Sequence, residues 1–210
     1  MIGTIADLVT SIAGVHLAVK GEEHLWTHRP AVFMINHQSN VDMFIASKLI
    51  RKDISGIAKK ELQNYPIIGQ LMQAGGVIFI DRKNRQKAIE AMKPAVDALK
   101  NGTSIVIFPE GTRSKSYQLG PFKKGAFHLA MQAGVPIIPM VLKNAHDVLP
   151  RGAALMKPSV VNVCILPPIP TSDWTKKNLD QNIAMVRELF LKELGQEDAK
   201  EKVKGNAASD

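Results

Sequence analysis

Two side chains in the segment Asn36–Asp42 could perform acid–base chemistry together, namely His37 and Asp42. They are five positions apart, and on a continuous helix they would lie about 140° apart, on different faces. They can therefore meet only if the chain turns between them. A carboxylate that holds one imidazole nitrogen leaves the other free to act as a general base. The alternative is a capping aspartate beside an incidental surface histidine, and the spacing alone leaves both interpretations open.

A second polar cluster, Pro-Glu-Gly-Thr-Arg, follows directly after the apolar run Ser104–Phe108. Its polar residues Glu110, Thr112 and Arg113 surround a glycine, which predicts a compact polar loop. The guanidinium of Arg113 is suited to bind a phosphate through two parallel hydrogen bonds. A solvated turn is the alternative for this cluster.

Two further apolar runs also end in charge. Their terminal residues are Asp81 and Arg82 after Val77–Ile80, and Lys59 and Lys60 after Ile54–Ile57. Taken singly, each pair fits a surface ion pair or a solvated basic face. Together with Arg113, however, three runs end in Lys or Arg beside one that ends in His and Asp. A separate surface ion pair or solvated basic face at each run does not explain why all of these runs end in such residues.

The elements that must position these clusters alternate along the chain. Seven strands are predicted, at Val15–Val19, Ala31–Ile35, Ile54–Ile57, Val77–Ile80, Ser104–Phe108, Ile137–Leu142 and Val160–Leu166. Helices are predicted at Val41–Ile50, Ile67–Ala74, Asn84–Leu99, Lys124–Ala133 and Leu179–Leu194. Pro94 lies inside one of these helices and should kink it. The pattern indicates a single α/β domain with a largely parallel central sheet flanked by helices, and its polar clusters belong at the carboxyl ends of the strands.

The same pattern places the domain at residues 13–194, after a short apolar helix over residues 1–12 and before a disordered tail over residues 195–210. The uncharged runs Leu62–Ile80 and Gly125–Leu142 approach membrane-spanning length, but proline, glycine and polar residues interrupt both. We therefore predict no transmembrane span. The first helix could either lie on a membrane surface or pack as an ordinary terminal helix.

The chain of 210 residues carries 27 Lys and Arg against 19 Asp and Glu, a formal charge of +8. The excess lies between Lys48 and Lys124, where 15 basic residues face 6 acidic ones, so an anionic partner or substrate is expected there. Aromatic residues make up only 5%, which disfavours nucleic acid because few rings can stack on bases. The single cysteine, Cys164, excludes a disulfide framework.

Several catalytic motifs are absent from the sequence. It contains no Gly-x-Ser-x-Gly elbow, no Walker loop and no dinucleotide glycine fingerprint, and the other histidines have no metal-ligand spacing with His37. These absences disfavour an acyl-enzyme, a nucleotide site and a zinc site. The chemistry that remains is a base that activates an incoming hydroxyl for direct attack.

In these clusters the chain resembles the glycerolipid acyltransferases, and among them the enzymes that acylate 1-acylglycerol 3-phosphate, also called lysophosphatidic acid. The family's His-x4-Asp block resembles Asn36–Asp42. Three later blocks resemble Gly76–Arg82, Phe108–Arg113 and Val135–Pro139, all in the expected order. The resemblance extends over residues 14–194.

This resemblance implies transfer of an acyl chain from acyl-CoA or acyl-acyl carrier protein to the free hydroxyl of the acceptor, giving phosphatidic acid. His37 would deprotonate that hydroxyl, and Asp42 would orient and stabilise the imidazole. The acceptor phosphate would be bound at the strand ends by Arg113, Arg82 and one of Lys59 or Lys60, in a pocket shaped by Glu110, Gly111 and Thr112. The segment Val135–Pro139 would form part of the acyl or acceptor wall. No metal or organic cofactor is implied.

The motifs leave other acceptors open, namely glycerol 3-phosphate or another lysolipid. Two alternative functions involve no acyl transfer. One is a non-catalytic module that binds anionic lipid or nucleic acid, and the other is a metal-assisted phosphoesterase with His37 and Asp42 as metal ligands. The resemblance places the protein at the cytoplasmic face of the cell membrane, with cations such as Lys48 and Arg51 facing anionic lipid. Family members usually carry a longer apolar segment than Met1–Ile12 before the first strand. Attachment would therefore rely on that short helix with the basic surface, or on another protein.

Overall fold

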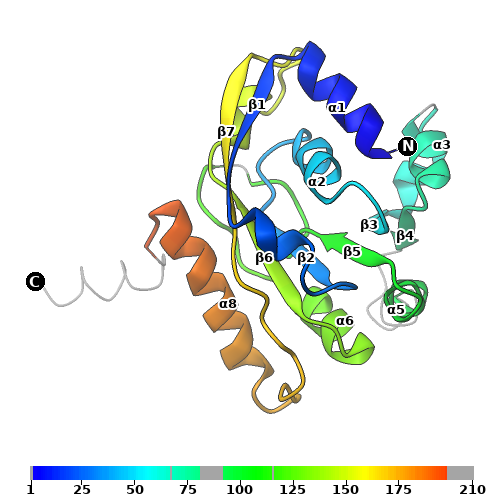
Figure 1. Ribbon diagram of the computed structural model, residues 1–210, viewed down its shortest axis with the longest axis vertical. Helices are drawn as coiled ribbons and strands as arrows, with labels where there is room; N and C mark the ends of the chain where they lie inside the picture. The colour runs from blue at the N-terminus through cyan, green and yellow to red at the C-terminus, as the bar shows by residue number, and fades with distance from the viewer. Residues whose placement is uncertain (1, 67, 81–91, 115, 198–210) are drawn as a thin grey trace, which may run out of the picture.

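The computed structural model describes residues 2–66, 68–80, 92–114 and 116–197 of the chain (Figure 1). The strands are β1 (Val15–Lys20), β2 (Val32–Ile35), β3 (Ile54–Lys59), β4 (Ile78–Ile80), β5 (Ser104–Ile107), β6 (Ile137–Leu142) and β7 (Ser159–Ile165). The α-helices are α1 (Ile2–Ile12), α2 (Asp42–Ile50), α3 (Ile68–Ala74), α5 (Lys93–Lys100), α6 (Gly125–Ala133), α7 (Ala145–Val148) and α8 (Leu179–Leu194). The short 3-10 helices are η1 (Glu22–Leu25) and η2 (Lys60–Asn64).

The strands described form one sheet in the order β1-β7-β6-β2-β5-β3-β4. Neighbouring strands are parallel except β6 and β7, where Met140 lies opposite Ile165 in an antiparallel register. As a result, β2, β3, β4, β5 and β6 all end at one edge of the sheet, and β1 and β7 begin there. We call this the carboxyl edge, and the sequence predicts the site at this place.

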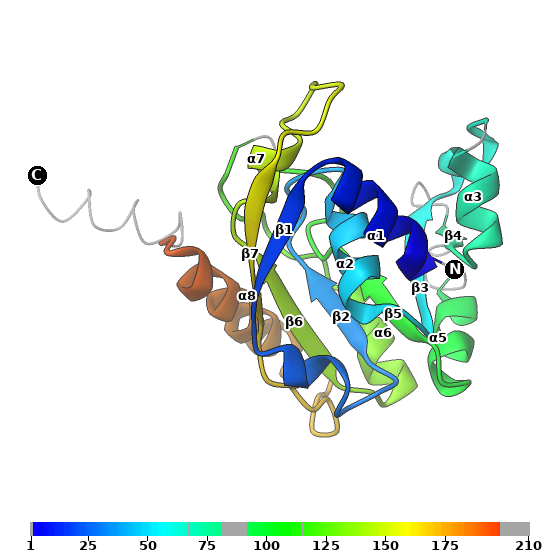
Figure 2. The ribbon, with the colours of Figure 1, turned by 45° about the horizontal axis from the view of Figure 1, so that its top comes forward.

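Alternating side chains along the buried strands separate two apolar layers. In β2, Val32 and Met34 belong to one layer, whereas Phe33 and Ile35 belong to the other. The first layer lies under α5, α6 and α8, and the second lies under α2 and α7. Helix α1 packs mainly on α2, outside the second layer (Figure 2).

All seven predicted strands are present, with ends shifted by no more than two residues, and the largely parallel α/β fold is confirmed. The prediction that Pro94 kinks a helix is wrong for the helix that the structure describes. Helix α5 begins at Lys93, so Pro94 lies in its first turn, where a missing N–H costs no hydrogen bond. The rest of that predicted helix, residues 84–91, lies outside the described residues. The sequence misses α7 because four residues are too few to show a helical period.

Helices α1 and α8 lie on opposite faces of the sheet. Helix α1 occupies the place expected for the first helix, and α8 ends at Gly195, a C-cap with a left-handed φ of 64°. Residues 198–210 of the expected tail lie outside the described residues. Across the part of the chain that the structure describes, no helix is long and apolar enough to cross a membrane.

Candidate active site

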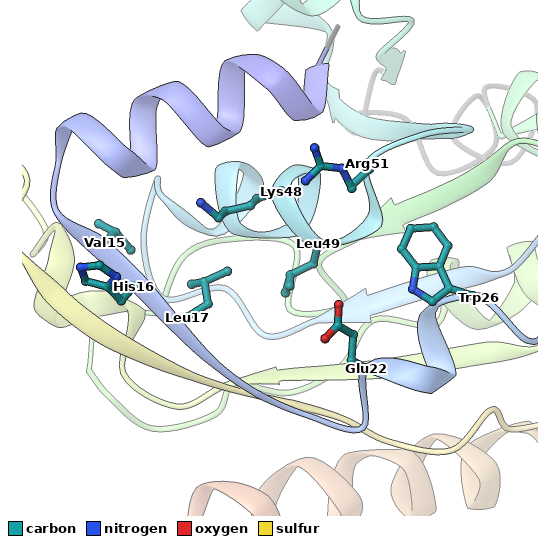
Figure 3. Close-up of a pocket in the computed structure, with 8 residues that line it drawn as sticks. All are labelled: Val15, His16, Leu17, Glu22, Trp26, Lys48, Leu49 and Arg51. Atoms are coloured by element: carbon teal, nitrogen blue, oxygen red, sulfur yellow. The ribbon is translucent and has the colours of Figure 1, made fainter.

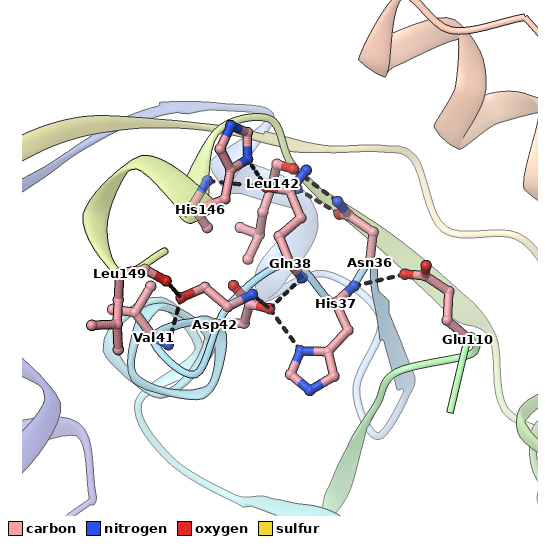
Figure 4. Close-up of polar contacts among 11 residues, drawn as sticks. Asn36, His37, Gln38, Val41, Asp42, Glu110, Leu142, His146 and Leu149 are labelled. Carbon is pink, nitrogen blue, oxygen red and sulfur yellow. Dashed lines mark hydrogen bonds and ion pairs between the residues drawn. The ribbon is translucent and has the colours of Figure 1, made fainter. Parts of the chain in front are cut away.

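His37 and Asp42 meet in the turn between β2 and α2 (Figure 4). The imidazole Nδ1 of His37 lies 2.8 Å from Oδ2 of Asp42. The backbone N–H groups of Gln38 and Ser39 donate to the same oxygen, each at 2.8 Å. The contact that the resemblance implies is therefore present, because the chain turns between the two residues and places Asp42 at the start of α2.

The Asp42 carboxylate is fully buried, and this burial raises its pKa above the usual aspartate value, although the hydrogen bond with His37 opposes the shift. Its other oxygen, Oδ1, has no hydrogen-bond partner among the described residues, so Oδ2 alone anchors the turn. Because Oδ2 is an acceptor, the His37 nitrogen that faces it carries the proton. The imidazole then presents Nε2 as its unprotonated nitrogen, which is the arrangement of a general base.

The ring of Phe108 fixes the plane of the His37 imidazole. Phe108 follows β5, the neighbour of β2 in the sheet, and the two ring centroids are 4.0 Å apart at an interplanar angle of 18°. Asp42 thus holds one ring nitrogen while Phe108 limits rotation of the ring. The sequence does not predict this role, because an aromatic residue at a strand end suits stacking and core packing equally.

Glu110 ties two backbone segments together at the site. Its Oε1 accepts the N–H of His37 at 2.8 Å, and its Oε2 accepts the N–H of Gly120 at 2.9 Å. The side chain is only 6% exposed. Burial raises the pKa of Glu110, and the two backbone hydrogen bonds oppose that shift. Both oxygens are thus engaged by main chain, so Glu110 shapes the site through the backbone that it holds.

The loop after β5 lies directly against the His37 main chain. The N–H of Ser114 donates to the His37 carbonyl at 2.9 Å, which holds the half-buried Arg113 beside the turn. Gly111 has a φ of 72°, and a Cβ there would lie 2.9 Å from Nζ of Lys123. The lysine side chain could move aside, so it is the left-handed φ that favours glycine at this position. The loop also brings the Lys123 ammonium to the cluster, although the sequence assigns that cation no specific role.

The other expected phosphate-binding residues lie at adjacent strand ends. Thr112 is exposed in the same loop, and the exposed Lys59 and Lys60 lie where β3 ends and η2 begins. Because β2, β5 and β3 are neighbours, their ends lie side by side at the carboxyl edge. Arg82, which follows β4, lies outside the described residues.

The amide side chains of Asn36 and Gln38 hold this turn in place. The buried Asn36 exchanges two hydrogen bonds with the main chain of Leu142, both 2.8 Å long. The Oε1 of Gln38 accepts the N–H of Ala145 at 3.1 Å and lies 3.3 Å from Nδ1 of His146. These bonds anchor the turn to the end of β6 and to α7.

A stretch of main chain close to the site is held by α8 and the residues that follow it. Gln196 accepts the N–H of Leu119 at 2.8 Å and donates to the carbonyl of Tyr117 at 2.7 Å. Arg187 donates to the carbonyls of Leu119 and Gly120, each at 3.3 Å. Because Gly120 also binds the site glutamate, α8 is linked to the turn through a short series of hydrogen bonds.

Two possible nucleophiles are engaged elsewhere. The hydroxyl of Ser39 donates to the Leu149 carbonyl at 2.8 Å. Cys164 is buried in β7, and burial raises the pKa of its thiol. Neither group is therefore available for attack next to His37. Among the residues described, no group of three or more His, Cys, Asp or Glu side chains could hold a metal ion.

The segment Val135–Pro139, expected as part of a substrate wall, leads away from His37. This segment leads into the start of β6, whereas His37 follows the end of β2, and the two strands run parallel. It therefore lies toward the opposite edge of the sheet, and Val135, Ile137 and Ile138 are buried in the apolar layers. A buried strand and an apolar substrate wall have the same composition, so the sequence could not separate them.

A cavity of about 330 Å³ lies away from the site and is lined by residues of β1, η1 and α2 (Figure 3). Two of its lining residues, Lys48 and Arg51, are cations that the sequence assigns to anionic lipid. Both pair with Asp7 of α1, Arg51 at 3.0 Å and Lys48 at 3.6 Å. In the fold they hold α1 against α2.

Comparison with known proteins gives four consistent matches. The family model described as Acyltransferase matches residues 16–143. The 1-acyl-sn-glycerol-3-phosphate acyltransferase of Limnanthes douglasii is 39% identical over 191 residues, which cover 90% of this chain and 67% of that protein. The protein of the same name from Salmonella typhimurium is 37% identical over 169 residues, which cover 80% of this chain and 68% of that protein. The crystal structure of the 1-acyl-sn-glycerophosphate (LPA) acyltransferase PlsC from Thermotoga maritima matches with a TM-score of 0.78 at 25% identity, over 93% of this chain and 79% of that one.

Proposed function

This chain belongs to the acyltransferase family, and we propose that it transfers an acyl chain from acyl-CoA or acyl-acyl carrier protein to the free hydroxyl of 1-acylglycerol 3-phosphate. The product is phosphatidic acid. The observation that carries the proposal is the 2.8 Å contact between His37 and Asp42 at the end of β2. The names of the relatives and of the matching crystal structure support the choice of acceptor.

The reaction needs one base and one leaving group. Nε2 of His37 takes the proton of the acceptor hydroxyl as its oxygen attacks the thioester carbonyl. Buried Asp42 stabilises the imidazolium that forms, because the opposite charges lie close together in an apolar surrounding. The tetrahedral intermediate then collapses, the C–S bond breaks, and the thiolate leaves with the proton that His37 returns.

The acceptor phosphate would lie at the neighbouring ends of β5 and β3. Arg113 supplies a planar guanidinium suited to two parallel hydrogen bonds, and one of Lys59 or Lys60 adds a second cation. Arg82 would join them from the end of β4. Glu110, Gly111 and Thr112 shape this pocket. The two backbone hydrogen bonds of Glu110 support an indirect contribution, through the position of the loop.

A second acceptor class uses the same groups. Glycerol 3-phosphate or another lysolipid with a phosphate presents that phosphate and a hydroxyl to the same cations and base. The relatives' shared name favours 1-acylglycerol 3-phosphate. Because this acceptor carries an acyl chain, the protein would act at the surface of an anionic membrane. It would lie there as a peripheral or monotopic protein on the cytoplasmic face.

The direct test incubates the purified protein with lysophosphatidic acid and oleoyl-CoA. We expect free thiol and phosphatidic acid to form in equal amounts, and we expect neither with the His37→Ala variant. Parallel reactions with glycerol 3-phosphate and with acyl-acyl carrier protein identify the preferred acceptor and donor. Absence of thiol release with every thioester donor and every acceptor would rule out the proposed enzyme.

A further inference from the structure

We propose that Arg187 on α8 and Gln196 just after it are positioning residues for the base. They hold residues 117–120, which we call the support segment, and the support segment in turn fixes the main chain of His37. The inference rests on the proposed function, because it assigns a task in that reaction to two side chains that supply no reacting group.

Both main-chain polar groups of His37 are held by the loop that follows β5. Its N–H donates to Oε1 of Glu110 at 2.8 Å, and its carbonyl accepts the N–H of Ser114 at 2.9 Å. Figure 4 shows the Glu110 carboxylate at the His37 main chain, while the imidazole extends toward Asp42. The two contacts therefore fix the point from which the imidazole extends and leave its Nε2 unengaged.

The same two residues of the loop also bind the support segment. The Oε2 of Glu110 accepts the N–H of Gly120 at 2.9 Å. The hydroxyl of Ser114 donates to the carbonyl of Gln118 at 2.9 Å. Because both contacts lead to one segment, a displacement of that segment would disturb the N–H and the carbonyl of His37 together.

The support segment is held from its other side by α8 and the residue after its cap. The Oε1 of Gln196 accepts the N–H of Leu119 at 2.8 Å, and its Nε2 donates to the carbonyl of Tyr117 at 2.7 Å. Arg187 donates to the carbonyls of Leu119 and Gly120, each at 3.3 Å. Two side chains thus engage the backbone along the support segment.

The end of α8 fixes the place from which Gln196 reaches this segment. Gly195 caps the helix with a left-handed φ of 64°, and the N–H of Gln196 donates to the carbonyl of Leu191 at 2.9 Å. A glycine followed by such a bond is the Schellman arrangement of a helix C-terminus. The backbone of Gln196 is therefore held in place, and its amide has a defined origin.

Helix α8 itself is anchored by apolar packing. Val186, Phe190 and Leu191 are buried in the first apolar layer, and Leu119 of the support segment belongs to the same layer. This packing holds the helix without help from the two polar side chains. Substitution of either one should therefore leave α8 in place and change only the hold on the support segment.

The alternative is that these hydrogen bonds serve only to dock the helix. That role predicts a loss of stability with no effect on the base. We favour positioning because the bonds end on the main chain of the one segment that Glu110 and Ser114 both contact. The bonds therefore continue to the residue that carries the imidazole.

The test compares variants of the full chain in steady-state turnover of lysophosphatidic acid and oleoyl-CoA. Gln196→Met keeps the length of the side chain and removes its polar atoms. Its kcat should fall about tenfold and the KM of each substrate should change less than about twofold, because a displaced base slows the reaction without touching substrate contacts. Arg187→Met should behave alike, and Arg187→Lys, which keeps one donor, should recover part of the loss. Gln181→Met, on the exposed surface of α8, is the matched control and should keep the kcat of the unchanged chain.

A proton NMR signal gives a readout that docking alone would not move. The Nδ1–H of His37 lies in the hydrogen bond to Asp42, and its signal is identified by its loss in His37→Ala. We expect that signal to shift in Gln196→Met and Arg187→Met and to stay unchanged in Gln181→Met. Circular dichroism should show all variants folded.

Two results would overturn the proposal. One is a lower melting temperature with the NMR signal and the kcat per folded chain unchanged, which would assign the bonds to docking of α8. The other is a raised KM at unchanged kcat, which would assign the residues to substrate binding. If the unchanged chain turns over no acceptor while the signal still shifts in both variants, the proposed function fails and the positioning role stands.

Discussion

The carboxylate of Glu110 accepts the backbone N–H of His37 at 2.8 Å, so the loop after β5 fixes the main chain of the residue proposed as the base. The same carboxylate accepts the N–H of Gly120 at 2.9 Å. Two backbone segments that are remote in sequence are therefore held at one buried side chain. The position of His37 depends on a residue that does not touch its imidazole.

Glu110→Gln tests this dependence. The amide keeps one acceptor oxygen but turns an NH₂ group toward one of the two backbone N–H donors. We expect the free energy of unfolding to fall by about 1–3 kcal/mol and kcat to fall about 10- to 100-fold, because a small displacement of the base is costly. The KM of the acceptor should change less than kcat. Glu188→Gln, on the exposed surface of α8, is the control. A variant with the kcat and thermal stability of the unchanged chain would contradict the positioning role.

Asp42→Asn tests the orientation of the imidazole. The substitution removes the charge that stabilises the imidazolium while keeping the size of the side chain. We expect kcat to fall about 10²- to 10⁴-fold with the fold intact. Steady-state kinetics with circular dichroism of the same samples checks this. Retention of more than a tenth of the original kcat would show that the pair is not the catalytic base.

Arg113→Ala tests the phosphate contact. Loss of a charge-assisted pair should raise the KM of the acceptor about 10- to 100-fold, with a smaller change in kcat. Arg113→Lys keeps the charge but loses the planar pair of donors. Its KM for the acceptor should therefore lie between that of the unchanged chain and that of Arg113→Ala. Kinetics at varied acceptor concentration, with the thioester saturating, measures the effect. An unchanged KM in both variants would remove Arg113 from the phosphate site.

The pH dependence of stability follows from the raised pKa of Glu110. A raised pKa means that the folded chain still holds the proton of the Glu110 carboxyl at pH values where the unfolded chain has released it. In that range a fall in pH stabilises the fold. This stabilisation is complete below the ordinary glutamate pKa of 4.5. It is lost as the pH rises through the pKa of Glu110 in the folded chain. Denaturant unfolding should therefore show the stability of the unchanged chain, relative to Glu110→Gln, increasing from about pH 7 to about pH 5. A relative stability that decreases over this range would mean that the pKa is lowered.

The sequence predicts the part of the site that local patterns determine. Apolar runs followed at once by polar clusters mark the strand ends. The spacing leaves the contact between His37 and Asp42 open, and the resemblance to the glycerolipid acyltransferases implies it. The contact of Glu110 with the His37 backbone escapes prediction because its partners are 73 positions apart. The stacking of Phe108 on His37 escapes for the same reason, since it depends on which strands become neighbours.

Charge and hydropathy identify what a residue can do but not what surrounds it. Lys48 and Arg51 are basic residues in a basic stretch, and the sequence assigns them to lipid. The fold places Asp7 beside both of them. Val135–Pro139 is apolar and suits a substrate wall equally well, but the segment enters β6 from the opposite edge of the sheet and is mostly buried there.

The reversed direction of β1 and β7 has a consequence for the order of assembly during synthesis. β1 lies at the end of the sheet and pairs with β7, so that Val15 meets Ser159. Strand β1 must therefore wait until the chain has been made through Ile165 before it finds its partner in the sheet. Such a long-range pairing is a late and slow step of folding. Until then, α1 packs beside a sheet that lacks its β1 strand.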